Sequence, residues 1–288
     1  YLRVLKLKVM AKPTSNIGAF KGTIDGITYY TLNGKWVCRK SAPPSKERIK
    51  TDPRYKAVRK NNKEFGGASS YAKAIRMGLL PYVHEFKDYS FNSRLTSRCL
   101  QLVKAGRGVK GERSLNACNA PETLVGLELN EHNKLSDRLR FQPKLDPDAV
   151  RVLVDFAGLN KEHLMAPEHA THFELLLIRY NLMAFTYDQK RQQYTSELDP
   201  EALEVLRMLT PPIAIDDIPQ PLEVNLPFYS SDQYTWAYLE DPNPMFSMNT
   251  VAKKTAHTVW LGIRFGQESN NILEAFPAHN AMQCLAIY

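Results

Sequence analysis

The spacing of apolar residues changes near residue 120, and this change constrains the fold more than any other feature of the chain. Before it, apolar side chains recur at three- and four-residue steps in residues 53–86 and 91–105, the period of amphipathic helices. After it, short β-compatible runs alternate with turn residues. These runs are residues 123–129, 139–141, 150–156, 172–184, 222–226, 258–265 and 281–287. The pattern predicts an α+β protein whose C-terminal part is an antiparallel, β-sandwich-like domain.

Local signals refine the helical assignments. Asp52-Pro53 supplies an N-cap followed by a proline in the first helical position, so a helix is expected to begin there. Gly66-Gly67 predicts an interruption of that helix. A short helix is also expected over residues 199–209, within the β-rich part of the chain, because an Asp-Pro pair opens it and two prolines follow it.

A β-hairpin is predicted near the N-terminus. Residues 18–41 read as two alternating strands, and Asn33-Gly34 between them fits the two positive-φ positions of a type I′ turn. The strands carry aromatic and basic side chains. The expected N-terminal part is therefore a β-hairpin followed by helices.

Charge divides the chain more sharply than its net value of +8 indicates. Residues 1–114 contain 25 Lys and Arg against 7 Asp and Glu, whereas residues 115–288 contain 13 against 23. We therefore predict an extended arm over residues 1–17, a basic hairpin-and-helix region over 18–114 and an acidic domain over 115–288. Such an asymmetry indicates which partners the protein can bind, because the summed charge of a surface steers association.

Self-association is the function that this asymmetry favours. The basic part of one copy can meet the acidic part of the next, and heterologous contacts of this kind generate rings or filaments. Residues 5–9 alternate as a strand does and can add to a sheet edge of the same or a neighbouring copy, or form a short ordered tail on their own domain. We thus expect a structural protein that forms a filament, tube or other polymer. The candidate contact residues are Leu5, Leu7, Val9, Tyr29, Tyr30, Trp36, Arg39 and Lys40.

Other interpretations stay open. The basic and acidic parts of one chain can face each other, or the basic part can be a solvated surface. The basic residues between positions 35 and 63, with Trp36 and Tyr55 among them, also suit binding to nucleic acid, which is the alternative function and partner. An enzyme of unrecognised type is the third hypothesis.

No catalytic, metal-binding or cofactor-binding residue is expected. Residues 106–111 match the letters G-x-G-x-x-G, but a predicted helix precedes them where dinucleotide binding requires a strand. His163, His169 and His172 lack a metal-binding frame, and Cys38, Cys99, Cys118 and Cys284 form no close pair. We therefore expect a protein that is not an enzyme and has no cofactor.

The sequence also bears on location. No run approaches the roughly 18 apolar residues of a membrane helix. No targeting segment is evident, so the cytoplasm is the default compartment, with extracellular assembly after release as an alternative.

Two segments resemble an uncharacterised family of bacterial proteins. Residues 20–30 (FKGTIDGITYY), followed by Asn33-Gly34-Lys35 and Arg39-Lys40, are similar to the G-x-x-G-x-x-[YF]-Y hairpin and basic stretch that open those proteins. Residues 261–268 and 280–282 resemble their C-terminal strands. The family has no assigned activity. The resemblance implies a bacterial or phage-related origin and favours a protein that is not an enzyme.

Overall fold

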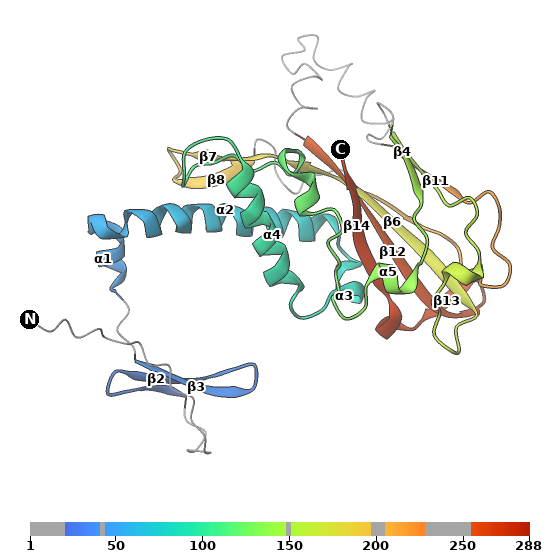
Figure 1. Cartoon of the computed structure of the whole chain (residues 1–288), viewed down its shortest axis with the longest axis horizontal. Helices are drawn as coiled ribbons and strands as arrows, with labels where there is room; N and C mark the ends of the chain where they lie inside the picture. The colour runs from blue at the N-terminus through green and yellow to red at the C-terminus, as the bar shows by residue number, and fades with distance from the viewer. Residues whose placement is uncertain (1–20, 41–43, 148–150, 197–204, 228–254) are drawn as a thin grey trace, which may run out of the picture. The chain divides into compact units, whose positions relative to one another are not determined.

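The computed structural model describes residues 21–40, 44–147, 151–196, 205–227 and 255–288. Contacts divide the chain into two compact units, Tyr1–Arg59 and Lys60–Tyr288. Figure 1 shows both helices and antiparallel sheets, so the predicted α+β class is confirmed. The predicted change of charge near residue 114 lies inside the second unit.

The first unit contains a three-stranded antiparallel sheet. Its strands are β1 (Gly22–Ile24), β2 (Ile27–Leu32) and β3 (Lys35–Lys40), in that order. Asn33 and Gly34 have φ of 50° and 74°, so the predicted turn is present, and Asp25 and Gly26 repeat it between β1 and β2 with φ of 49° and 75°. Positive φ at both central positions is what a two-residue hairpin turn needs. The predicted hairpin is therefore extended by one short strand.

Two short helices follow, α1 (Lys46–Thr51) and η1 (Pro53–Tyr55). Asp52 caps η1 by accepting a hydrogen bond from the Arg54 N–H at 2.9 Å, as the Asp-Pro pair predicts. The Arg59 guanidinium donates to the carbonyls of Ile49 and Asp52 at 2.8 and 3.0 Å. These bonds fix the end of α1 against the start of the next helix.

The long helix α2 (Lys56–Gly78) runs without a break through Gly66-Gly67, so the predicted interruption is wrong. Gly67 allows a close approach instead, because a Cβ at this position would lie 2.6 Å from the Tyr194 ring. Gly66 faces open space. Helices α3 (Val83–Phe86) and α4 (Phe91–Ala105) follow, and α4 matches the predicted helix.

A six-stranded antiparallel sheet organises the second unit (Figure 1). Its central pair is β6 (His172–Met183) and β12 (Thr255–Ser269). On one side, β9 (Val205–Leu209) and β10 (Ile213–Ala214) pair with β6. On the other side, β13 (Ile272–Ala275) and β14 (Ala281–Ile287) pair with β12.

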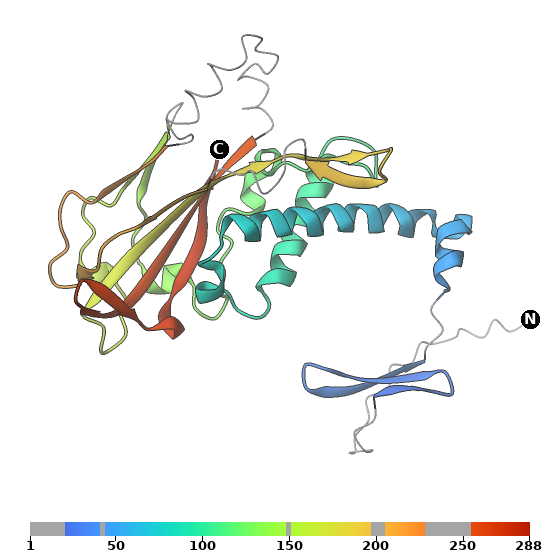
Figure 2. The same ribbon diagram turned by 180° about the vertical axis from the view of Figure 1, so that it is seen from behind.

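Both faces of this sheet are buried in separate cores. One face, with Ile178 and Trp260, packs in a cluster with buried residues of α2 and α4. The other face, with Leu177 and Leu261, packs against a three-stranded sheet of β4 (Lys144–Pro147), β5 (Arg151–Asp155) and β11 (Glu223–Pro227). Figure 2 shows the helices and this small sheet from behind. The two facing sheets are compatible with the predicted sandwich-like arrangement.

Shorter elements connect these layers. They are η2 (Ala117–Asn119), η3 (Pro121–Thr123), α5 (Leu135–Arg138), η4 (Lys161–His163), β7 (Phe185–Asp188), β8 (Gln193–Ser196) and η6 (Pro277–His279). Within the described residues, no helix combines the length and the apolar character needed to cross a membrane.

Three predicted elements differ in the structure. Residues 139–141 were expected to form a strand, but only Leu139 forms an isolated β-bridge, with Leu164. Residues 123–129 were also expected to form a strand, but they form the end of η3, a turn and an isolated β-bridge between Glu128 and Gln283. The backbone of residues 126–129 bonds to β14. The predicted helix over residues 199–209 is also wrong where it can be compared, because 205–209 form β9 and pair with β6. Residues 197–204 lie outside the described residues.

The neighbouring glycines of α2 provide a matched test of the helix packing. Gly67→Ala is expected to lower the free energy of unfolding by about 1–3 kcal/mol, because the new methyl group overlaps the buried Tyr194 ring. Gly66→Ala, one residue earlier in the same helix, is expected to raise it by about 0.5–1 kcal/mol through helix propensity. Chemical denaturation measures both values. Equal effects of the two substitutions would contradict the described packing.

Candidate assembly surface

The predicted contact residues within the described chain lie on one small sheet. Tyr29 and Tyr30 belong to β2, and Trp36, Arg39 and Lys40 belong to β3. The register of the two strands separates these side chains between opposite faces, because paired residues of antiparallel strands share a face. The other predicted contacts, Leu5, Leu7 and Val9, lie outside the described residues.

One face, which we call the Tyr30 face, combines apolar and basic side chains. It consists of Thr23, Thr28, Tyr30, Leu32, Lys35, Val37 and Arg39. The Arg39 guanidinium carbon lies 5.6 Å from the centroid of the Tyr30 ring, a cation–π contact. Leu32 is 56% exposed at the hairpin end. This face therefore presents an aromatic and aliphatic centre beside two exposed cations.

The opposite face, which we call the Trp36 face, is also rich in apolar groups. It consists of Ile24, Ile27, Tyr29, Thr31, Trp36, Cys38 and Lys40. Ile24 is 52% exposed. No residue between 21 and 40 is buried in the structure as described, so this sheet contains no core of its own.

The described part of the first unit is strongly basic. Residues 21–59 contain 10 Lys and Arg against 3 Asp and Glu. The Asp52 carboxylate lies near Arg48 and Arg54, at 3.5 and 3.6 Å, and both arginines are more than half exposed. Exposed pairs of this kind contribute little stability, so the charge of the unit is available for association.

The glycine-rich loop at residues 106–111 serves a structural purpose. The Gly111 N–H donates to the buried Glu64 carboxylate at 2.7 Å, and Arg113 lies 3.4 Å from the same carboxylate oxygen. The Glu64 carboxylate thus accepts the hydrogen bond from the Gly111 N–H that a bound phosphate would need. Gly111 has φ of 99°, and a Cβ on Gly106 would overlap the Ser114 carbonyl. The glycines are explained by backbone geometry.

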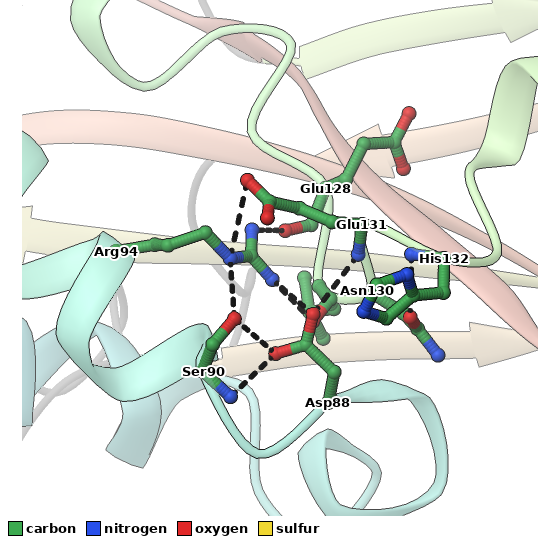
Figure 3. Close-up of polar contacts among 8 residues, drawn as sticks. Asp88, Ser90, Arg94, Glu128, Asn130, Glu131 and His132 are labelled. Atoms are coloured by element: carbon green, nitrogen blue, oxygen red, sulfur yellow. Dashed lines mark hydrogen bonds and ion pairs between the residues drawn. The ribbon is translucent and has the colours of Figure 1, made fainter. Parts of the chain in front are cut away.

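A polar network joins the start of α4 to residues 128–131, which follow the backbone contacts with β14 (Figure 3). The Arg94 guanidinium donates to the Asp88 carboxylate at 2.8 Å and to the carbonyls of Glu128 and Leu129 at 2.9 and 3.1 Å. Glu131 approaches Arg94 only at 3.5 Å and is 57% exposed. The network therefore depends on Asp88 and the two carbonyls.

The two carboxylates of this region have opposite pKa shifts. Burial alone would raise the pKa of Asp88, but hydrogen bonds from the Glu131 N–H and from Ser90, with the charge of Arg94, outweigh burial and lower it. Burial raises the pKa of Glu128 to about 7, and the hydrogen bond from the Leu135 N–H opposes that shift. Figure 3 shows the Glu128 carboxylate turned away from Arg94.

A second polar group is buried on the sheet itself. The Asn181 side-chain oxygen accepts from Arg179 at 3.1 Å and lies 2.7 Å from His257 Nδ1. Burial and then the charge of Arg179 lower the pKa of His257 to about 4, so this imidazole is neutral near pH 7. This group was not predicted from the sequence, although Arg179 and Asn181 interrupt the apolar run over residues 175–183.

The histidines and cysteines singled out from the sequence do not form a metal centre. Among the described residues, no group of three or more His, Cys, Asp or Glu side chains is arranged to hold an ion. His163 Nδ1 accepts from the Asn160 N–H at 3.2 Å as part of a helix cap, and His172 Nδ1 lies 2.9 Å from the Thr171 hydroxyl. The imidazoles of His163 and His172 thus have local partners.

Comparison with known proteins finds no matching family, no matching curated protein and no matching solved structure. The resemblance to the uncharacterised bacterial family therefore stays a prediction.

The raised pKa of Glu128 predicts a measurable pH dependence. Between pH 4.5 and about 7 the folded protein holds this proton more tightly than the unfolded chain does, so the contribution to stability is present at low pH and is lost as pH rises. Glu128→Gln should remove about 1–2 kcal/mol of this loss, a value reduced for solvent screening. Denaturation at pH 5 and pH 8 measures it.

Glu131→Gln is the control for this experiment, because its side chain is 57% exposed and belongs to the same segment. It should keep the pH dependence of the wild type. If Glu128→Gln also keeps it, the burial of Glu128 does not control its proton.

Proposed function

We propose that this chain is a structural protein that self-assembles, as the protomer of a filament, tube or other polymer. One observation carries the proposal: β1–β3 form a sheet with exposed apolar side chains on both faces and no buried residue among 21–40. A small sheet without a core is marginally stable alone and gains stability when a partner covers it.

The chemistry of this sheet suits a protein partner. Exposed Ile24 and Leu32 lose contact with water when a face is covered, which is the main favourable term in protein association. Tyr30, Trp36 and Arg39 are of the residue types that dominate binding energy at interfaces. The sheet thus combines an apolar driving force with groups that give specificity.

Polymer growth requires two different surfaces on each copy. The first unit supplies the β1–β3 sheet, while residues 115–288 carry the excess of acidic groups. A contact between unlike surfaces leaves one of each unoccupied at the ends of a growing chain of copies, so assembly continues unless a ring closes. This favours a ring or an open polymer over a symmetric dimer.

Strand addition is the second contact in this proposal. Within the described residues, no strand pairs with the outer edge of β3, and an edge strand of this kind can accept a further strand. Leu5, Leu7 and Val9 stay the proposed donor segment, on the basis of their alternation with lysines. The proposed protomer has no enzymatic activity and acts in the cytoplasm or after release from the cell.

The basic residues of α1, η1 and the start of α2 favour nucleic-acid binding as a second candidate function. Their exposed members are Lys46, Arg48, Lys50, Arg54 and Lys56. Clustered cations neutralise phosphates without reading sequence, and such binding weakens steeply with salt.

Sedimentation velocity of the full chain over a concentration series tests self-assembly. The wild type should associate, and Ile24→Glu/Leu32→Glu should weaken the association about ten-fold or more, because the two residues lie on opposite faces of the sheet and a contact through either face would bury one new carboxylate. Phe65→Glu/Tyr89→Glu is the matched control, since Phe65 and Tyr89 are 55% and 89% exposed in the second unit.

That control pair should associate like the wild type. A wild type that stays monomeric at every concentration would refute the proposal. Equal association of both variant pairs would show that the β1–β3 sheet is not the contact.

Fluorescence anisotropy with a labelled DNA duplex tests the second candidate. If these basic residues bind phosphate, Lys50→Glu/Arg54→Glu should weaken binding and lower its salt dependence, while Ile24→Glu/Leu32→Glu should leave it unchanged. Absence of binding by the wild type at low salt would exclude this function.

A further inference from the structure

Three segments of the second unit meet at one end of the six-stranded sheet. They are residues 155–172, 214–223 and 266–275, and we call the surface they form the acidic end. The Thr171 N–H donates to the Gly266 carbonyl at 3.0 Å, and the Ile215 N–H donates to the Thr171 carbonyl at 3.0 Å. Backbone hydrogen bonds therefore fix the three segments against one another.

The three segments are strongly negative, although two exposed cations of the neighbouring part of the chain lie against them: Lys144 pairs with Asp155, and the Arg140 N–H donates to the His163 carbonyl. The segments themselves contain 8 Asp and Glu and a single cation among Lys and Arg, Lys161. The exposed carboxylates are Glu162, Glu168, Asp216, Asp217, Glu223 and Glu274. Lys161 lies 2.9 Å from Asp216, but both side chains are at least 66% exposed, so this pair leaves most of the charge uncompensated.

Apolar groups lie among these carboxylates. Ile272 is 67% exposed, beside the turn that joins β12 to β13. Ile215, Ile218 and Leu222 pack against the sandwich core and are only partly buried. The surface thus mixes exposed aliphatic side chains with acidic ones.

The Tyr30 face has the complementary composition. Tyr30, Leu32 and Val37 form its apolar part, and the exposed side chains of Lys35 and Arg39 provide its positive charge. Opposite charge around apolar centres raises the rate and the specificity of association. The acidic end repels phosphate backbones, so a nucleic acid does not suit it as a partner.

We infer that the Tyr30 face of one copy docks on the acidic end of a second copy. This inference rests on the proposed self-assembly and names the surface that receives the sheet. Each copy has one surface of each kind, so the contact is heterologous and repeats from copy to copy.

Charge reversal on each surface, followed by mixing, tests the inference. Lys35→Glu/Arg39→Glu makes the Tyr30 face acidic, and Asp216→Lys/Asp217→Lys makes the acidic end basic. Each variant alone should associate about ten-fold or more weakly than the wild type, since like charges then face each other. An equimolar mixture should recover association to within about three-fold of the wild type, because opposite charges again meet at every contact.

Glu122→Lys/Glu131→Lys makes the same change of charge outside the acidic end and should associate like the wild type. Recovery on mixing also shows that both defective variants are folded. Sedimentation velocity of wild type, variants and mixture provides all the readouts.

The outcomes separate the two proposals. If the wild type associates and Asp216→Lys/Asp217→Lys associates equally well, the acidic end is not the receiving surface, although self-assembly stands. The same holds if the mixture fails to recover. If the wild type does not associate at all, both proposals are overturned.

Discussion

The antiparallel pairing of β6 with β12 is the interaction on which the second unit depends. The two strands pair without a register shift from Met183 and Thr255 to His172 and Gly266. Successive side chains of each strand point to opposite faces, and nearly all of them are buried. One strand pair therefore builds two cores at once: Ile178 and Trp260 face the helices, and Leu177 and Leu261 face the smaller sheet.

Polar contacts then fasten the helices to the sheet. Arg264 on β12 reaches Glu174 on β6 at 3.3 Å and Glu85 on α3 at 3.6 Å, so one guanidinium joins two strands and a helix. Arg94 joins α4 to the carbonyls of Glu128 and Leu129, which lie beside β14. Buried ions are costly to leave without a partner, and these contacts thus specify one arrangement of helices. The charges of Arg264 and Arg94 therefore have a structural role.

The β1–β3 sheet is built on the opposite principle. It has regular pairing and two well-formed turns, yet none of its residues is buried. Its apolar groups therefore contribute little to the stability of the isolated unit and are available to a partner. This contrast between a deeply buried sheet and an exposed one is the basis of the proposed assembly.

Sequence reasoning succeeded where local chemistry decides the structure. Asn33-Gly34 determines its turn, Asp52-Pro53 its helix start, and the apolar runs of β6, β12 and β14 are long enough to identify as strands. It failed where a distant contact decides. Residues 205–209 have a helix-compatible pattern but pair with β6.

Gly67 allows the Tyr194 ring to pack closely on α2, and the backbone of residues 126–129 bonds to β14 outside any strand. Neither partner is near in sequence. For the candidate surface, the residue types could be predicted, but the separation of Tyr30 and Arg39 from Tyr29, Trp36 and Lys40 required the register of β2 and β3.

Hydrogen–deuterium exchange of the β1–β3 amides, measured against protein concentration, tests the central claim most directly. The account predicts rapid exchange in dilute monomer, where the sheet has no core, and strong protection at concentrations where copies associate, while β6 and β12 stay protected throughout. Protection of β1–β3 that is already complete in dilute monomer, or that never increases as copies associate, would contradict it.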